Sequence, residues 1–438
     1  MIWSLMWSHM RRLILAGIVV WFVTAVGAYA GEAEYPLAEA VECTVRGGMP
    51  NALAKLDRGG EVRIAYIGGS ITAAEGWRPQ TTRWLQEQYP KAKIVEINAA
   101  IGGTGSDLGV FRFRRDGLEQ KPDLVFVEFA VNDGEAPPEQ IYRCMEGIVR
   151  QAWRQDATID ICFVYTLVDG MVPTLAGGRF PRAASAMEKI AGHYGIPSIH
   201  MGLEVVRLAT GGQMILKADP KTDQEKAEMK GKMIFSADGV HPHAETGHRL
   251  YTEAVARSVQ KMKGVGVAGA HGLPEAFVAN NYEAAKTIPL GRAKLSGGWE
   301  KLPATHPLAR SFGRYLPEMH AAKDAGQSVS FAFKGTYVGF FDLLGPDCGQ
   351  LEGTLDGKTV TVLRFDPYCT YHRMGSFALG KDLGDAVHRV QVKVDARMPD
   401  KAAILAKRNE KMGDSRRFEG HTWYAGWIMI VGDMEGGE

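Results

Sequence analysis

One serine of this chain follows a strand-like run and two glycines, in the stretch "IAYIGGSIT" at residues 64–72. A serine hydroxyl is a weak nucleophile near neutral pH, so it needs a histidine to take its proton and a carboxylate to orient that histidine. Asp238 and His241 lie three residues apart in "DGVHP", which lets the carboxylate bond one ring nitrogen while the other faces Ser70. The sequence therefore predicts Ser70 as the nucleophile, His241 as the general base and Asp238 as the carboxylate that orients His241.

Attack of such a serine on a carbonyl carbon creates an oxyanion, which fixed hydrogen-bond donors must stabilise. The backbone N–H of Ser70 is one candidate donor, and the side-chain amide of Asn132 in "AVND" is another. The segment "NAAIGGTGS" at 98–106 offers a third donor, because glycine lets a backbone approach without a side chain in the way. Gly102 and Gly103 compete for this role, and we prefer Gly103 on its position in the motif.

These residues also have ordinary structural explanations. The serine can cap a helix. Asn132 and Asp133 can form a turn, and we assign Asp133 a structural role only. His241, His243 and His248 form a trio that metal sites also use, but no cysteine lies nearby. We therefore predict no metal site and no cofactor.

The segments between residues 62 and 263 must position these groups. Strand-like runs occur at 62–67, 93–97, 124–130, 159–165 and 196–200, and helix-like runs at 77–88, 140–155, 182–193 and 245–262. Strands that alternate with helices indicate a parallel sheet built from βαβ units. In such sheets the functional site lies beyond the carboxyl ends of the strands. Ser70, Gly103 and Asn132 each follow a predicted strand, so we expect them at one edge of the sheet.

In this order, the four motifs resemble the conserved blocks of the SGNH (GDSL-type) hydrolase superfamily. "YIGGSIT" is similar to the first block, with Gly69 where many members have aspartate, and "NAAIGG", "AVND" and "DGVHP" are similar to the others. The resemblance covers roughly residues 60–263. It implies a flavodoxin-like three-layer α/β/α fold with a parallel sheet, and a serine esterase mechanism through an acyl-enzyme without a metal.

The chain of 438 residues is long enough for more than one domain. Two arginines, an apolar run and "AYA" predict a signal peptide at 1–30, and hence a secreted, periplasmic or extracellular protein; an uncleaved anchor is the alternative. We further predict an N-terminal extension at 31–61, the catalytic domain at 62–263, a linker at 264–280 and an all-β sandwich or jelly-roll domain at 281–438.

Strand-like runs mark the predicted β domain. They occur at 329–333, 337–341, 359–365, 387–394 and 423–432, and "LDGK" at 355–358 is a hairpin-turn signal. The charged segment 217–232 before the histidine motif predicts an exposed loop or helix, with a lid over the site as the alternative.

Composition limits the partners of the protein. The formal net charge of +1 gives no general attraction to nucleic acid, and we expect no stable membrane insertion after signal cleavage. The five cysteines contain no CxxC pair, and Cys348 with Cys369 is the disulfide to test first, against the alternative that all the thiols are unpaired.

The resemblance also implies a substrate class, since exported members with an extra β-sandwich often act on O-acetylated polysaccharides. Several aromatic residues could stack on sugar rings or form the sandwich core: Trp299, Tyr315, Tyr368, Tyr371, Trp423, Tyr424 and Trp427. Trp77 could likewise line the substrate pocket or lie in the core. A lipolytic or thioester hydrolase of longer acyl chains and a non-catalytic carbohydrate-binding protein are the two alternative functions.

Overall fold

The structure, a computed structural model, describes residues 35–436; the predicted signal peptide lies outside the described residues. A six-stranded sheet forms the centre of the first domain, in the order β1-β6-β5-β4-β2-β3. Its strands are β1 (Cys43–Thr44), β2 (Glu61–Gly68), β3 (Lys93–Asn98), β4 (Leu124–Glu128), β5 (Asp160–Tyr165) and β6 (Ser198–His200). All are parallel except β1, which pairs antiparallel with β6.

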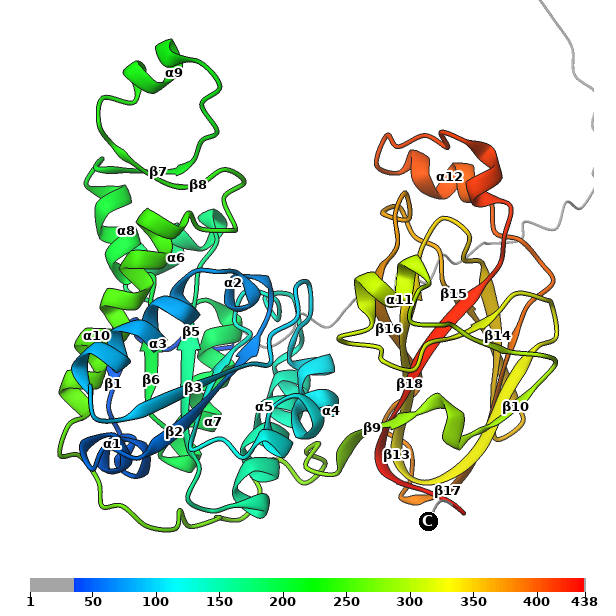
Figure 1. The fold of residues 1–438 in the computed structure, drawn as a ribbon, viewed down its shortest axis with the longest axis horizontal. Coiled ribbons are helices and arrows are strands. Elements are labelled where there is room, and N and C mark those ends of the chain that lie inside the picture. Colours follow the sequence, from blue (N-terminus) through cyan, green and yellow to red (C-terminus); the bar gives the residue numbers. More distant parts are fainter. Residues whose placement is uncertain (1–34, 437–438) are drawn as a thin grey trace, which may run out of the picture. The chain divides into compact units, whose positions relative to one another are not determined.

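Helices cover both faces of this sheet, as the alternation of strands and helices predicts. They are α1 (Pro50–Asp57), α2 (Ser70–Ala73), α3 (Trp77–Gln88), α4 (Ser106–Asp116), α5 (Pro138–Gln155), α6 (Val172–Ala176), α7 (Arg182–Tyr194), α8 (Leu203–Thr210) and α10 (Arg249–Met262). Helices α3 and α10 pack together on one face, and α4, α5 and α7 lie on the other (Figure 1). The predicted α/β/α fold is therefore confirmed.

Local sequence explains the layers. Strand β4 reads "LVFVE" and is buried along its whole length, as a strand covered on both faces requires. Helix α5 buries Ile141, Met145, Ile148 and Ala152, which recur at the spacing of one helix face.

The strand order β3-β2-β4-β5-β6 is the doubly wound order in which the first strand lies between the second and the third. The chain leaves β2 in one direction to reach β3, then crosses back to β4. The crevice between these connections opens at the carboxyl ends of the strands. The loops after β2, β3 and β4 carry the glycine, serine and asparagine motifs to that edge.

Segments before residue 62 and after residue 263 also pack on this domain. Strand β1 and helix α1, which lie within the predicted extension 31–61, contribute a strand to the sheet and pack against β2 and β5. In the predicted linker, the ring of His271 bonds Asp160 at 2.8 Å and stacks on Trp153. The linker therefore lies along the α/β domain.

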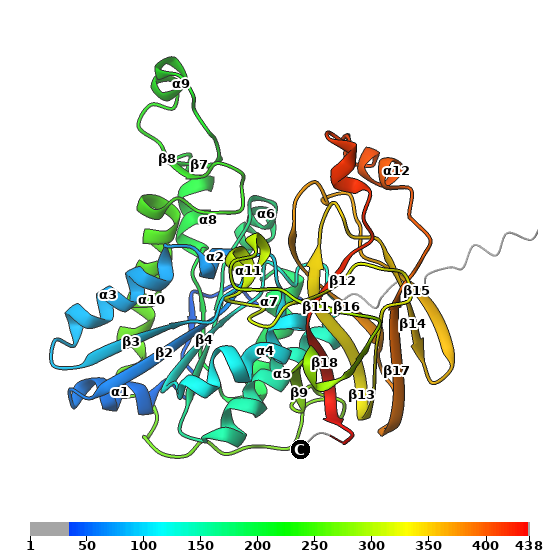
Figure 2. The ribbon, with the colours of Figure 1, turned by 45° about the vertical axis from the view of Figure 1, so that its right-hand side comes forward.

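The charged segment before the histidine motif forms part of an excursion from the domain. Parallel strands β7 (Met214–Lys217) and β8 (Met233–Ser236) form its base and α9 (Asp223–Glu228) its tip, which projects beyond α8 (Figure 2). A capping box between Thr222 and Glu225 begins α9. The base of the excursion leads directly into Asp238.

The second domain is all-β, as predicted. Its strands are β9 (Ala285–Pro289), β10 (Lys294–Ser296), β11 (Glu300–Lys301), β12 (His320–Ala322), β13 (Ser328–Leu344), β14 (Gln350–Leu355), β15 (Lys358–Leu363), β16 (Arg373–Gly380), β17 (Ala386–Val394) and β18 (Trp423–Met434). Short helices α11 (Pro307–Phe312) and α12 (Lys401–Ala406) lie between them. The long strand β13 pairs antiparallel with β10, β16, β17 and β18, and its core side chains pack with those of β17 and β18.

The "LDGK" turn joins β14 to β15, and this predicted hairpin is confirmed. Asp356 and Gly357 both have positive φ, +48° and +80°, which a two-residue turn of this kind requires.

The expected disulfide is absent, because Cys348 and Cys369 are both free, buried thiols. The Cys348 Sγ donates to the carbonyl of Leu343, and the Cys369 Sγ accepts from the backbone N–H of Asp366. Each thiol is thus satisfied by its own loop. All the cysteines between residues 35 and 436 are unpaired, so the alternative to a disulfide is the correct one.

From Leu37 onward the chain forms one compact unit, in which the β domain meets helix α4. The ring centroids of Phe111 in α4 and Tyr337 in β13 lie 4.8 Å apart, and the Arg115 guanidinium lies 4.5 Å from the centre of the Trp427 ring. Arg314 donates to the carbonyl of Asn98 at 2.9 Å. The second domain is therefore held next to the loop that carries Gly103.

Candidate active site

Ser70 is the first residue of α2 and follows two glycines whose missing side chains leave room for other groups. A β-carbon at Gly68 would lie 2.7 Å from the carbonyl oxygen of Glu128. A β-carbon at Gly69 would overlap the side-chain oxygen of Asn132. The glycine pair therefore lets the turn before Ser70 pack against the end of β4 and the loop that follows it.

The structure brings Ser70, His241 and Asp238 together. The Ser70 Oγ lies 2.8 Å from His241 Nε2, and His241 Nδ1 lies 2.6 Å from Asp238 Oδ2. With the ring proton on Nδ1, that nitrogen donates to the carboxylate, and Nε2 accepts from the serine hydroxyl. This is the hydrogen-bond chain of a serine hydrolase triad.

The Asp238 carboxylate is itself fixed by its neighbours. Its Oδ1 accepts from the backbone N–H groups of Val240 and His241, both at 2.8 Å, and from the Ser236 hydroxyl at 2.9 Å. Burial raises the pKa of the Asp238 carboxyl, but hydrogen bonds from His241 and Val240 outweigh burial and hold that pKa below its ordinary value. The carboxylate is therefore ionised at neutral pH, as an acceptor for the histidine requires.

Ser236 is a residue of this site that the sequence pattern did not single out. Its buried hydroxyl also accepts from the backbone N–H groups of Asp238 and Gly239, at 3.1 and 2.6 Å. A serine two residues before an aspartate is a common local turn, so only its position before "DGVHP" could have drawn attention to it.

The oxyanion candidates lie on loops around the serine. A β-carbon at Gly102 would lie 3.6 Å from the Ser70 Cβ, so this loop passes directly beside the nucleophile. Gly103 is exposed, and its φ of +73° turns the backbone at that point. The Asn132 amide lies against Gly69. The three loops meet at Ser70, and the donor roles of Ser70, Gly103 and Asn132 remain predictions.

Asp133 connects two of these loops. Its buried Oδ1 accepts from the backbone N–H of Ser106 at 2.9 Å, where α4 begins. The carboxylate thus holds the loop after β4 to the loop after β3, consistent with a structural role. Burial raises the pKa of the Asp133 carboxyl to about 7, although Ser106 donates to it.

This raised pKa gives Asp133 a pH-dependent effect on stability. Between pH 4 and 7 the unfolded chain loses the Asp133 proton before the folded protein does, so wild type loses stability as pH rises. Asp133→Asn keeps an acceptor for Ser106 and cannot ionise. We expect the variant to gain about 2–4 kcal/mol relative to wild type between pH 5 and pH 8. Urea unfolding of both proteins at pH 5 and pH 8 measures this difference. The prediction would be contradicted if the free energy of unfolding changed with pH by the same amount in the variant and in wild type.

Trp77 does not line a substrate pocket, because its side chain is fully buried. It packs edge-on against Tyr66 and Phe126 on the sheet, so the core alternative is the correct one. Its backbone N–H donates to the buried Nδ1 of His248 at 3.1 Å.

That contact also separates the histidine trio. His241 is bonded to Asp238 and Ser70, while His248 faces Trp77. Among residues 35–436, no group of three histidine, cysteine or acidic side chains is placed to hold a metal ion. Over the same residues, no helix has the length and apolar character needed to cross a membrane.

The aromatic residues of the β domain divide into two groups. Trp423, Tyr424 and Trp427 are buried; Trp423 lies in the sandwich core, whereas Trp427 packs against Arg115 of helix α4. Tyr368 and Tyr371 are exposed, and the Arg408 guanidinium lies 3.8 Å from the centre of the Tyr368 ring. Of these five described residues, Tyr371 alone is exposed and has no cation over its ring.

A cavity of ≈ 390 Å³ lies between the two domains and includes Gly103. The α/β domain contributes Gly103, Thr104, Gly105, Asp107 and Leu108. The β domain contributes Leu344, Leu363, Arg364, Phe365, Asp366, Arg373, Met374, Gly375 and Ser376. We call this space the interdomain cleft; it combines apolar side chains with a paired arginine and aspartate, Arg373 and Asp366.

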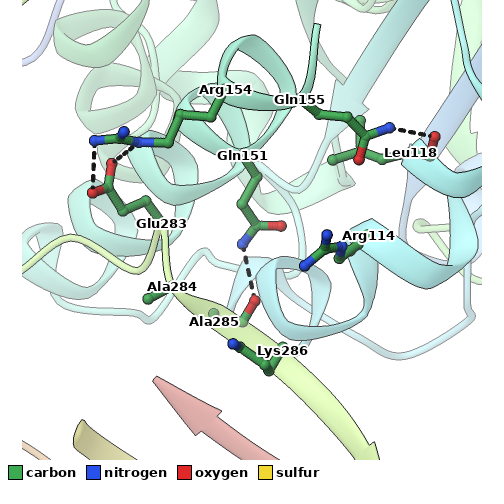
Figure 3. A pocket seen from close by; sticks show the side chains of 9 residues that line it. All are labelled: Arg114, Leu118, Gln151, Arg154, Gln155, Glu283, Ala284, Ala285 and Lys286. Atoms are coloured by element: carbon green, nitrogen blue, oxygen red, sulfur yellow. Dashed lines mark hydrogen bonds and ion pairs between the residues drawn. The ribbon is translucent and has the colours of Figure 1, made fainter. Parts of the chain in front are cut away.

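A second cavity, of ≈ 260 Å³, lies where α5 meets the segment that leads into β9 (Figure 3). Gln151 donates to the carbonyl of Ala285, and Arg154 pairs with Glu283 across it. Its lining includes no residue of the triad or of the oxyanion loops, so we assign it no part in the reaction.

Comparison with known proteins begins with the α/β domain. The model of the GDSL-like lipase/acylhydrolase family matches residues 66–250, which include Ser70, Gly103, Asn132, Asp238 and His241. The match covers most of the α/β domain. No curated protein matches the sequence.

Solved structures extend the comparison beyond residues 66–250. A two-domain esterase (CEX) active on acetylated mannans, co-crystallized with mannopentaose, has 19% sequence identity and a TM-score of 0.66. The alignment covers 88% of this chain and 94% of that one. A second crystal structure of a two-domain esterase (CEX) active on acetylated mannans gives 19% identity, a TM-score of 0.65, and coverages of 88% and 95%. The α/β domain and the β domain together therefore form a known two-domain fold.

Proposed function

We propose that the protein is a serine esterase that removes O-acetyl groups from polysaccharides or oligosaccharides through an acyl-enzyme. The single observation that carries the esterase activity is the Ser70–His241–Asp238 chain, with contacts of 2.8 and 2.6 Å at the carboxyl edge of the sheet. From the predicted signal peptide we further propose that this activity lies outside the cytoplasm.

In the proposed reaction, His241 Nε2 takes the Ser70 proton while the Ser70 Oγ forms a bond to the ester carbonyl carbon. The carbonyl oxygen becomes an oxyanion, which the backbone N–H groups of Ser70 and Gly103 and the Asn132 amide stabilise. The bond from the carbonyl carbon to the sugar oxygen then breaks, and imidazolium protonates the leaving alcohol. Water repeats these steps on the acetyl-serine and releases acetate.

The interdomain cleft supports a saccharide substrate. It reaches Gly103 on one side and contains Arg373 and Asp366 on the other, and paired charged side chains of this kind bind sugar hydroxyls. The crystallised two-domain esterase of the same fold acts on acetylated mannans and was crystallised with mannopentaose. Both observations favour acetylated glycans over isolated small esters.

Acetate release from acetylated mannan, acetylated xylan and aryl acetates tests the proposal. We expect wild type to release acetate and Ser70→Ala to be slower by about four orders of magnitude or more. Equal rates for the two proteins would exclude Ser70 as the nucleophile. No release by wild type from any acetate ester would exclude the acetylesterase.

Longer acyl chains are the second candidate, because Leu344, Leu363 and Phe365 give the cleft an apolar part. A series of aryl esters from acetate to decanoate separates the two activities. An acetylesterase has its highest kcat/KM on acetate, whereas a lipolytic or thioester hydrolase has it on the longer chains.

A further inference from the structure

Glu128, the last residue of β4, is a buried carboxylate that the proposed reaction does not use. Only 1% of its surface is exposed. Among the residues that the structure describes, no lysine, arginine or histidine forms an ion pair with it. A buried carboxylate without a cation is costly unless hydrogen-bond donors surround it.

Three donors surround this carboxylate. The Thr72 hydroxyl donates to Oε2 at 2.9 Å, and the Thr166 hydroxyl donates to Oε1 at 2.8 Å. The backbone N–H of Gly69 also donates to it. Burial raises the pKa of the Glu128 carboxyl, and the three donors oppose that rise by favouring the ionised form.

Two of the three donors flank the nucleophile in sequence. Gly69 comes immediately before Ser70, and Thr72 comes two residues after it. Helix α2 has only four residues, too few to hold its own geometry. The third donor, Thr166, follows β5 and donates to the other oxygen of Glu128, away from the turn that carries Ser70.

The sequence motif shows why such support is needed. Gly69 has no side chain that could fix the turn before Ser70 from within. The carboxylate of Glu128 approaches the same turn from the neighbouring strand, where Gly68 and Glu128 are register partners in β2 and β4.

We propose that Glu128 is a positioning residue, whose carboxylate holds the Gly69–Thr72 turn so that the Ser70 hydroxyl stays aligned with His241. This inference rests on the proposed function only in taking Ser70 as the nucleophile. It predicts that loss of the carboxylate slows attack by Ser70 without weakening substrate binding.

The test compares Glu128→Gln, Thr72→Val and Thr166→Val with wild type. The two valine variants each remove one hydroxyl from the same carboxylate, and only Thr72 belongs to the turn of the nucleophile. The readouts are kcat and KM on an aryl acetate, the rate of Ser70 labelling by a fluorophosphonate, and the thermal unfolding temperature.

We expect Glu128→Gln and Thr72→Val to lower kcat and the labelling rate by about 10- to 100-fold, with KM within twofold of wild type. Thr166→Val is expected to lower the unfolding temperature by about as much as Thr72→Val does. Its kcat is expected to stay within threefold of the wild-type value. Equal kcat losses in the two valine variants would assign Glu128 a general structural role and overturn the proposal. Wild-type labelling rates in Glu128→Gln and Thr72→Val would also overturn it.

Fluorophosphonate labelling separates this inference from the proposed substrate. Labelling needs only a reactive Ser70, so it reports on Glu128 even if no acetylated glycan is hydrolysed. Suppose that wild type hydrolyses no acetate ester but is labelled rapidly at Ser70, and that Thr72→Val is labelled slowly. This result would overturn the proposed acetylesterase activity and would support the positioning role of Glu128. Should Glu128→Gln fail to fold, the two threonine variants decide the question.

Discussion

Replacing His241 with alanine is expected to lower kcat on aryl acetates by about four to six orders of magnitude, with little change in KM. The reason is that Nε2, which lies 2.8 Å from the Ser70 Oγ, is the group placed to take the serine proton and to return it to the leaving alcohol. Initial rates at saturating and limiting substrate measure the two constants. The residual activity comes from binding and from the oxyanion donors.

His243 provides the matched control, because it stands two residues away in the same "HPH" segment. Its side chain is exposed, and among the described contacts it reaches neither Ser70 nor Asp238. His243→Ala is expected to keep kcat within about twofold of wild type. A large loss of kcat in His243→Ala, together with a small loss of kcat in His241→Ala, would exclude the triad described above.

The second large effect is expected on stability, in the core of the β domain. The Asp342 carboxylate is fully buried and bonded by Arg364, whose Nε donates to it at 2.8 Å, and by the Trp423 indole N–H at 3.0 Å. Burial raises the pKa of Asp342 to about 6 despite these donors. Arg364→Leu would leave the carboxylate with the indole alone, so we expect a loss of about 3–5 kcal/mol in the free energy of unfolding.

Urea unfolding followed by tryptophan fluorescence measures this loss, since Trp423 contacts the same carboxylate. Adding Asp342→Asn to Arg364→Leu removes the uncompensated charge and is expected to recover part of the stability. Lys323→Ala, which breaks the exposed pair with Glu300, is expected to cost less than 1 kcal/mol. A loss below 1 kcal/mol in Arg364→Leu would contradict the prediction.

The parts of the fold that local sequence encodes could be predicted. Buried strands such as "LVFVE" and amphipathic helices such as α5 have their own periodicity, so the parallel sheet and its covering helices follow from the chain. The four motifs each come directly after a strand or before a helix, and the topology of the sheet brings them to one edge.

Features that depend on distant contacts could not be predicted. Helix α4 begins where Asp133, from another loop, accepts from the Ser106 N–H, and its "GVFRFR" run has no clear helical periodicity. The sequence predicts separate strand-like runs at 329–333 and 337–341, whereas β13 runs through both. Pairing with β18 carries the strand through a bulge at Gly335.

The site shows the same division. Ser70, Asp238 and His241 are found by residue type and spacing, whereas Glu128 acts on a turn 56 residues away through the Thr72 hydroxyl. Nothing in "VFVEF" distinguishes this glutamate from one at a strand end that faces solvent. Only the packing of three strands shows that its carboxylate lies under the nucleophile.

The place of strand β18 makes the two domains differ in how much of the chain each one needs. The strands and helices of the α/β domain end with α10 at Met262, so its secondary structure is complete before the β domain begins. The β sheet lacks a central strand until residues 423–434 pair with β12, β13 and β9. All three triad residues therefore come from a part of the chain that does not include β18, whereas one wall of the cleft belongs to a sheet that needs it.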